Sequence, residues 1–279
     1  MVTQGVALTT TAVTRHAFVT GAGSGIGLAT ATRFLQAGWN VSFNVFDENN
    51  ERAAHERIVE LSQEDPGALQ RSMVVRADVA DDGQCRSMVA SSLQRFARMD
   101  ALVNAAGITR FCDEADLEGI DAADFHAIYA VNTIGTFQMA RAASHALRAA
   151  TQSAGDVEGP TSAIVNLSSY AGIHGGGSSL AYGASKAAVN AVTLSLARAL
   201  APEVRVNAVC PALVAEGFVE RLQPESYQKR AAHQIERTPL RRVGKPSEIA
   251  ETIFWICTGA ALMTGEIIQL DAGLHLQAR

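Results

Sequence analysis

Hydrophobic and polar positions follow two alternating patterns along this chain. Short apolar runs rich in β-branched residues are each followed by a longer segment in which apolar residues recur with helical spacing. This alternation is typical of βαβ units. The short runs predict strands at residues 16–20, 40–46, 72–76, 101–104, 163–167, 204–209 and 267–270.

The longer segments predict helices at residues 26–37, 50–62, 83–96, 125–151, 182–201 and 247–257. Most of the predicted strands are too uniformly apolar for a sheet with one face in water, so we expect parallel strands covered by helices on both sides. With right-handed crossovers this gives an α/β fold, a Rossmann-type doubly wound parallel sheet of about seven strands.

Three polar stretches complete the organisation. Residues 1–15 are predicted to form a flexible tail and residues 153–160 a surface loop, so that residues 16–279 make a single domain. Residues 211–245, between the sixth strand and the last helix, have no regular pattern. In a fold of this kind we expect a substrate loop at that place.

A glycine-rich turn, TGAGSGIG at residues 20–27, directly follows the first predicted strand and directly precedes a helix. Gly21 allows a tight turn, Gly25 lets a ligand approach the backbone, and Gly27 lets the helix pack closely on the strand. The helix N-terminus adds free N–H groups and a positive dipole. A dinucleotide phosphate is therefore the expected ligand, and an ordinary glycine-rich turn without a ligand is the alternative.

The spacing G-x-x-x-G-x-G resembles that of the short-chain dehydrogenase/reductase family, in particular its members related to 3-oxoacyl-acyl carrier protein reductases. The resemblance extends over residues 16–276. It implies an NAD(P)-dependent oxidoreductase that moves a hydride between nicotinamide and a carbonyl or secondary alcohol. It also implies cofactor contacts for Asp78 and Val79, in the segment RADV, and for Asn104, Ala105 and Gly107, in the segment NAAG.

Tyr182 and Lys186 stand four residues apart in YGASK, so a helix places them on one face. A tyrosine has a pKa of about 10, and positive charge from Lys186 and from oxidised nicotinamide would favour the phenolate. Reduction of a ketone needs a proton on oxygen, and Tyr182 is the expected acid or base. A chance pair on a solvated helix face is the alternative, but the surrounding helix carries almost no other charge.

Ser169 and Asn132 complete the candidate catalytic set. Ser169, in VNLSSY, lies thirteen residues before Tyr182, as in the related reductases, and would hydrogen-bond the substrate oxygen. Ser168 is its rival, since neighbouring side chains on a strand point to opposite faces. Asn132 matches a family asparagine that kinks its helix and holds a water leading to the lysine, and a purely structural role is the alternative.

The segment PALVAE at residues 211–216 departs from the family pattern of Pro-Gly followed by Thr. Ala212 replaces the glycine, and Glu216 stands where threonine is usual, which would bring a carboxylate near the cofactor. The cofactor contacts then remain with Pro211 and the backbone around Val214. The residues expected to bind the cofactor are Gly21, Ser24, Gly25, Ile26, Gly27, Asp47, Asp78, Val79, Asn104, Ala105, Gly107, Tyr182, Lys186, Pro211 and Val214.

The choice between NAD and NADP depends on the end of the second strand. Val45 stands where the family usually has Asp, but Asp47 follows two residues later, on the same face of an extended segment. No Arg or Lys occupies Ser24, Val45 or Phe46, the positions from which related NADP enzymes reach the 2′-phosphate. We therefore favour NAD, with NADP as the alternative.

Charge and cysteine content argue against several other functions. The 279 residues carry a net charge of −5 without a long basic run, so nucleic acid is not an expected partner. The four cysteines lack CxxC spacing, which argues against a disulfide framework or a metal site. The chain shows neither a signal peptide nor an 18-residue apolar run, so we expect a soluble cytoplasmic protein without membrane contact.

Two predicted helices are too apolar for the surface of a monomer. Between residues 182 and 201 the only formal charges are Lys186 and Arg198, and between residues 131 and 150 only Arg141 and Arg148. Small and apolar residues on all sides imply a second burial partner. We therefore expect a homotetramer, as in the related reductases.

The sequence says less about the small-molecule substrate. His174, the glycines at 175–177, and residues 212–218 and 223–242 are expected to line its pocket, and a 3-oxoacyl thioester or a similar ketone is one candidate. A catalytically silent nucleotide-sensing or scaffold protein of the same fold is the alternative function. Such a protein would be expected to lack Tyr182 or Lys186.

Overall fold

The computed structural model describes residues 14–153 and 162–276. Seven strands form one parallel sheet in the order β3-β2-β1-β4-β5-β6-β7. The strands are β1 (His16–Thr20), β2 (Asn40–Val45), β3 (Ser72–Arg76), β4 (Ala101–Asn104), β5 (Ser162–Leu167), β6 (Val204–Pro211) and β7 (Ile267–Leu270). The predicted doubly wound sheet and its seven strands are confirmed.

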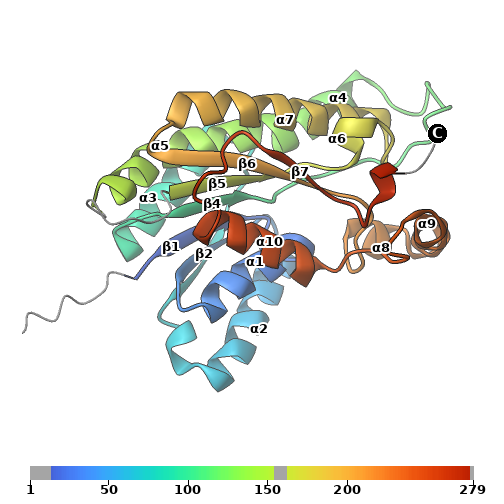
Figure 1. The fold of residues 1–279 in the computed structure, drawn as a ribbon. Coiled ribbons are helices and arrows are strands. Elements are labelled where there is room, and N and C mark those ends of the chain that lie inside the picture. Colours follow the sequence, from blue (N-terminus) through green and yellow to red (C-terminus); the bar gives the residue numbers. More distant parts are fainter. Residues whose placement is uncertain (1–13, 154–161, 277–279) are drawn as a thin grey trace, which may run out of the picture.

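Helices cover both faces of the sheet (Figure 1). One face is covered by α1 (Gly25–Gln36), α2 (Glu48–Glu64) and α10 (Pro246–Thr258). The other face is covered by α3 (Asp82–Phe96), α5 (Thr136–Ser153) and α7 (Leu180–Leu200). Two short elements lie between them, α6 (Ala171–His174) and the 3₁₀ turn Pro66–Ala68, and a third, the 3₁₀ turn Leu274–Leu276, follows β7.

Each helical layer packs on its own apolar core. Phe43 of β2 and Phe34 of α1 belong to the core on the α1 side, whereas Phe18 of β1 and Met139 of α5 belong to the core on the α5 side. All four side chains are fully buried. Because both faces of the sheet are covered, successive side chains of strands such as β1, β2 and β6 are buried, rather than alternate ones.

The single helix predicted at residues 125–151 is interrupted. The structure has α4 (Ala122–Tyr129), a π-helical turn (Ala130–Gly135) and then α5. The interruption surrounds Asn132, where the family resemblance implies a kink. A π turn is wider than an α turn and marks a position where local contacts override regular helix packing.

The segment between β6 and α10 is largely helical, which corrects the irregular loop predicted at residues 211–245. It contains α8 (Phe218–Leu222) and α9 (Pro224–Arg237), which lie together at one side of the molecule, beyond the sheet (Figure 1). Pro224 at the first position and the Gln, Arg and Ala residues that follow favour helix. Apolar residues in α9 are few, and although Tyr227, Ala231 and Ile235 recur with helical spacing, the prediction did not recognise the helix.

The predicted tail and the loop predicted at 153–160 lie almost entirely outside the described residues. Within residues 14–153 and 162–276, no helix is both long and apolar enough to span a membrane. The same ranges contain no group of three or more His, Cys, Asp or Glu residues placed to hold a metal ion.

Candidate active site

A cavity of about 1110 Å³ lies at the carboxyl ends of the strands. It extends from the ends of β2 and β3, past the glycine-rich turn, to α7 and α9. Parallel sheets of this type bind ligands at this edge, where the strand order reverses. The candidate residues that line it are Gly21, Ser24, Gly25, Ile26, Gly27, Asp47, Asp78, Val79, Ala105, Gly107, Ser169, Tyr182, Lys186, Pro211 and Val214.

The glycine-rich turn has the shape of a phosphate cradle. Gly21 has a φ of +63°, and a Cβ on Gly27 would lie 2.1 Å from the Gly21 carbonyl oxygen. Gly25 has a φ of +52°, and a Cβ there would meet only the Glu216 carbonyl oxygen, at 3.8 Å, so the space in front of α1 is open. Ser24 precedes α1 without using its hydroxyl to cap the helix. An open space at a helix N-terminus fits a dinucleotide phosphate.

The end of the cavity formed by β2 and β3 is here called the β2/β3 end. Asp47 caps α2 there, and its carboxylate accepts hydrogen bonds from the backbone N–H of Asn50 at 2.8 Å and from Asn50 Nδ2 at 2.7 Å. These bonds hold the pKa of Asp47 below its usual value, so the exposed carboxylate stays ionised. Asp78 accepts the N–H of Ala80 with one carboxylate oxygen, at 2.9 Å.

Asn104 does not line the cavity, and the cofactor contact expected of it stays a prediction. It ends β4 with a buried side chain, and its Nδ2 donates to Asn166 Oδ1 at 2.9 Å. The backbone N–H groups of Ala105 and Ala106 both donate to Thr20 Oγ1 at 3.0 Å. The last residue of the strand therefore points into the protein, and the turn that follows it forms the cavity wall.

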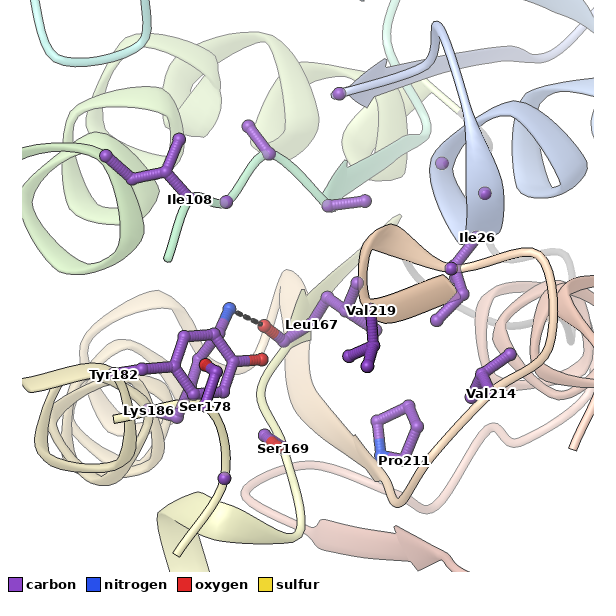
Figure 2. Close-up of a pocket in the computed structure, with 18 of the residues that line it drawn as sticks. Ile26, Ile108, Leu167, Ser169, Ser178, Tyr182, Lys186, Pro211, Val214 and Val219 are labelled. Atoms are coloured by element: carbon purple, nitrogen blue, oxygen red, sulfur yellow. Dashed lines mark hydrogen bonds between the residues drawn. The ribbon is translucent and has the colours of Figure 1, made fainter. Parts of the chain in front are cut away.

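Tyr182, Lys186 and Ser169 line one side of the cavity (Figure 2). Tyr182 and Lys186 lie in the first turns of α7, and Ser169 follows β5. The Ser169 side chain is hydrogen-bonded to Tyr182. Lys186 Nζ donates to the carbonyl oxygen of Leu167 at 2.7 Å and lies 5.7 Å from the centroid of the Tyr182 ring.

Ser168, the rival of Ser169, uses its hydroxyl within the protein. Its Oγ donates to the carbonyl oxygen of Lys186 at 3.0 Å, and its side chain is buried. Ser168 thus joins the end of β5 to α7, while Ser169 faces Tyr182.

Burial controls the ionisation of both groups on α7. It raises the pKa of Tyr182 to about 12, against the opposing effect of the Ser169 hydrogen bond, and lowers the pKa of Lys186 to about 8. In the chain without cofactor, desolvation therefore outweighs the groups that favour the phenolate, and the pKa of Tyr182 lies above its usual value rather than below it. At neutral pH Tyr182 is a protonated phenol and can donate its proton.

Asn132 lies behind the cavity rather than in it. Its Oδ1 accepts the N–H of Ile108 at 2.8 Å, and its Nδ2 donates to the carbonyl oxygen of Ile108 at 3.1 Å and to Ser185 Oγ at 3.0 Å. These bonds connect the turn after β4 with α7, which carries Tyr182 and Lys186. The geometry thus gives Asn132 a positioning role.

Glu216 does not bring its carboxylate into the cavity, contrary to expectation. Its φ is +56°, its N–H donates to the Glu220 carboxylate at 2.6 Å, and it is the backbone carbonyl that lies towards Gly25. Pro211, Ala212 and Val214 from the same segment do line the cavity.

Among the α9 side chains that line the cavity, which include Gln234, three are basic and were singled out by no sequence motif: Arg230, His233 and Arg237. Their segment, residues 223–242, was expected to line the pocket, but these three residues were not named individually. Their spacing of three and then four positions places them on one helical face, and this spacing was the available signal once a helix is assumed.

Known proteins match the chain over nearly its whole length. A family model described as enoyl-(acyl carrier protein) reductase matches residues 21–275. The 3-oxoacyl-[acyl-carrier-protein] reductase of Thermotoga maritima is 33% identical over 258 residues, which cover 92% of this chain and 96% of that protein. A Streptomyces violaceoruber protein, named as ketoacyl reductase 2 of the granaticin polyketide synthase, is 34% identical over 261 residues, 93% of this chain and 96% of that one.

A solved structure agrees with these matches. It is that of a Burkholderia xenovorans protein assigned to the short-chain dehydrogenases/reductases, 41% identical, with a TM-score of 0.84 over 95% of this chain and 99% of that one. The chain therefore belongs to the short-chain dehydrogenase/reductase family and is an NAD(P)-dependent oxidoreductase that acts on CH–OH groups.

Proposed function

We propose that this enzyme interconverts a ketone and a secondary alcohol, with NAD as the preferred cofactor and Tyr182 as the proton donor and acceptor. The observation that carries the proposal is the buried Tyr182 hydroxyl, hydrogen-bonded to Ser169 and placed beside Lys186 at the wall of a large cavity. When bound, the cofactor supplies or accepts the hydride.

In the reduction, the substrate oxygen accepts hydrogen bonds from Ser169 Oγ and Tyr182 Oη. As the carbonyl carbon is reduced, the electron pair of the C=O π bond moves to oxygen, and the proton of Tyr182 Oη forms the new O–H bond. Tyr182 becomes a phenolate, which Lys186 and Ser169 stabilise by charge and by hydrogen bonding. Oxidation of the alcohol runs the same steps in reverse.

The cofactor would lie between the glycine-rich turn and α7. Gly21, Gly25 and the N-terminus of α1 would hold its phosphates, and the backbone around Val214 its carboxamide. Support for NAD comes from the β2/β3 end, where Asp47 is ionised and, among the described lining residues, no Arg or Lys is present to bind a 2′-phosphate.

The names of the relatives support a 3-oxoacyl thioester or a similar ketone as the substrate. A panel of ketones and secondary alcohols that includes such a thioester, assayed with both cofactors at the nicotinamide absorbance band, tests the proposal. We expect turnover of at least one substrate, faster with NAD(H). Binding of NADH without turnover of any substrate would instead support the catalytically silent alternative.

We also propose that the enzyme is a homotetramer. Large apolar side chains stand exposed on the outer faces of the π-helical turn, α5 and α7: Ile134, Phe137, Leu180 and Leu194. Pairing of these helices across a two-fold axis would bury them. Light scattering at micromolar concentration should give about four times the chain mass of 29.4 kDa. A monomer would overturn this proposal without affecting the catalytic one.

A further inference from the structure

Charged side chains are unevenly divided along the cavity. Among the described residues that line it, the only carboxylates are Asp47 and Asp78, both at the β2/β3 end. Away from that end the cavity is lined by arginines and histidines instead: Arg221, Arg230, Arg237, His174, His233 and His275. Low-dielectric walls concentrate the field of such charges, so this end of the cavity attracts anions.

Helix α9 presents part of this basic surface in a fixed orientation. Arg230, His233 and Arg237 share one face of the helix. Gln234 anchors that face, since its buried side chain accepts the N–H of Leu213 at 3.1 Å. Arg237 Nη1 donates to His233 Nε2 at 3.0 Å, so the guanidinium and the imidazole of these two residues are held together.

Arg230 is linked to the catalytic tyrosine through Gly177. Its Nη1 donates to the carbonyl oxygen of Gly177 at 3.1 Å, and a Cβ on Gly177 would lie 3.2 Å from Cδ1 of Tyr182. Within residues 14–153 and 162–276, Arg230 forms no salt bridge. A guanidinium has five N–H donors in a planar fork that matches a carboxylate or a phosphate.

We propose that the substrate carries an anionic group and that Arg230, supported by the Arg237–His233 pair, binds it. The inference rests on the proposed function and narrows its substrate to an anionic ketone or alcohol. Because Arg230 is hydrogen-bonded to Gly177, which lies beside Tyr182, the anion site adjoins the catalytic site. A carboxylate of an oxo acid and a phosphate of a thioester carrier share this chemistry.

Matched substrate pairs distinguish the two sources. One pair is acetoacetate and its neutral methyl ester, and the other is acetoacetyl-CoA and the neutral acetoacetyl N-acetylcysteamine thioester. Arg230→Gln should raise KM for the charged member roughly ten- to a hundredfold, because it removes a charge-assisted hydrogen bond, and leave KM for the neutral member nearly unchanged. If the site binds a carboxylate, KM should rise for acetoacetate but not for its methyl ester. If the site binds a phosphate, KM should rise for acetoacetyl-CoA but not for the N-acetylcysteamine thioester.

Lys229→Gln is the matched control, since Lys229 is the neighbouring residue on α9 and does not line the cavity. It should change neither KM value. If Arg230→Gln affects charged and neutral substrates equally, or neither, the anion site is overturned while the proposed function stands.

A binding measurement covers the case in which none of these substrates is turned over. Acetoacetate or inorganic phosphate should raise the Tm of the NADH-bound wild type, but not that of NADH-bound Arg230→Gln. Such a result would keep the anion site although the proposed reaction had failed. Equal shifts in both proteins, or no shift in either, would overturn the anion site.

Discussion

Titratable side chains are buried in different ways at the two ends of the parallel strands, which are here called the amino edge and the carboxyl edge of the sheet. At the amino end of β1, His16 is fully buried, with Nδ1 2.6 Å from the carbonyl oxygen of Arg98 and Nε2 2.9 Å from Ser42 Oγ. At the carboxyl edge, Tyr182 and Lys186 are also buried, but they line the cavity. Burial lowers the pKa of His16 to about 4, so both edges hold strongly shifted groups.

A shifted pKa therefore does not by itself distinguish a functional group from a structural one in this protein. Both ring nitrogens of His16 are bonded within the chain, so its shift only affects folding. Tyr182 and Lys186 have shifted pKa values and also line a cavity that is large enough for a ligand. Three experiments test this contrast.

The largest effect is expected at the carboxyl edge. Tyr182→Phe should lower kcat on the order of 10²- to 10⁴-fold, because it removes the proton donor, and should leave NADH affinity nearly unchanged. Initial rates and a fluorescence titration with NADH measure the two quantities. Tyr129→Phe, in α4 and outside the cavity, is the control. Near-normal turnover by Tyr182→Phe would show that Tyr182 is not the proton donor, and the functional contrast between the two edges would be wrong.

The next effect concerns the amino edge and is an effect on stability alone. The unfolded chain protonates His16 below about pH 6.5, but the folded chain does so only near pH 4. The unfolded state thus binds more protons in this window, and the free energy of unfolding falls as the pH falls. The His16 contribution to this loss is about 2 kcal/mol between about pH 7 and about pH 5.

Urea unfolding of the wild type and of His16→Gln at both pH values isolates this contribution. The loss of stability should be smaller in His16→Gln, and should remain at its wild-type size in His55→Gln, where the substituted side chain is exposed on α2. Identical pH dependence in all three proteins would mean that His16 keeps an ordinary pKa in the fold.

The smallest effect is expected at Asp47. Asp47→Asn keeps a side chain that can cap α2 but removes the charge, so the preference for NAD over NADP in kcat/KM should shrink roughly five- to tenfold. Glu48→Gln is the control, because this neighbouring carboxylate does not line the cavity. An unchanged ratio in Asp47→Asn would place the choice of cofactor elsewhere.

The elements with strong local patterns could be predicted from the sequence. The strands follow from apolar runs, and the turn around Gly21 and Gly27 follows from glycines that the backbone geometry requires. The helix α9 was missed because it has few apolar residues and depends on Gln234 and its contact with Leu213 for its place. Such long-range anchoring leaves no local pattern.

The direction in which a side chain points and the cost of removing it from water were harder to predict than its place in the fold. Asn104 stands where the motif places it, yet its side chain turns towards Asn166 instead of the cavity. The pKa of Tyr182 moves opposite to the expected direction, because the cost of burying a phenolate depends on the surrounding protein and not on the spacing to Lys186.

The π-helical turn sets the angle by which α5 is rotated about the helix axis relative to α4. A π turn contains one residue more than an α turn, so deleting one residue from Ala130–Gly135 would restore regular helix and rotate α5 by about 100° relative to α4. Gln138 Nε2 now donates to the carbonyl oxygen of Val79 at 2.8 Å, while Asn132 is bonded to Ile108. A regular helix could keep only one of these two contacts. The additional residue in the π turn thus lets Asn132 and Gln138 make both contacts from one continuous helical segment. In a chain without this residue, either the turn at Val79 or the loop at Ile108 would have to move.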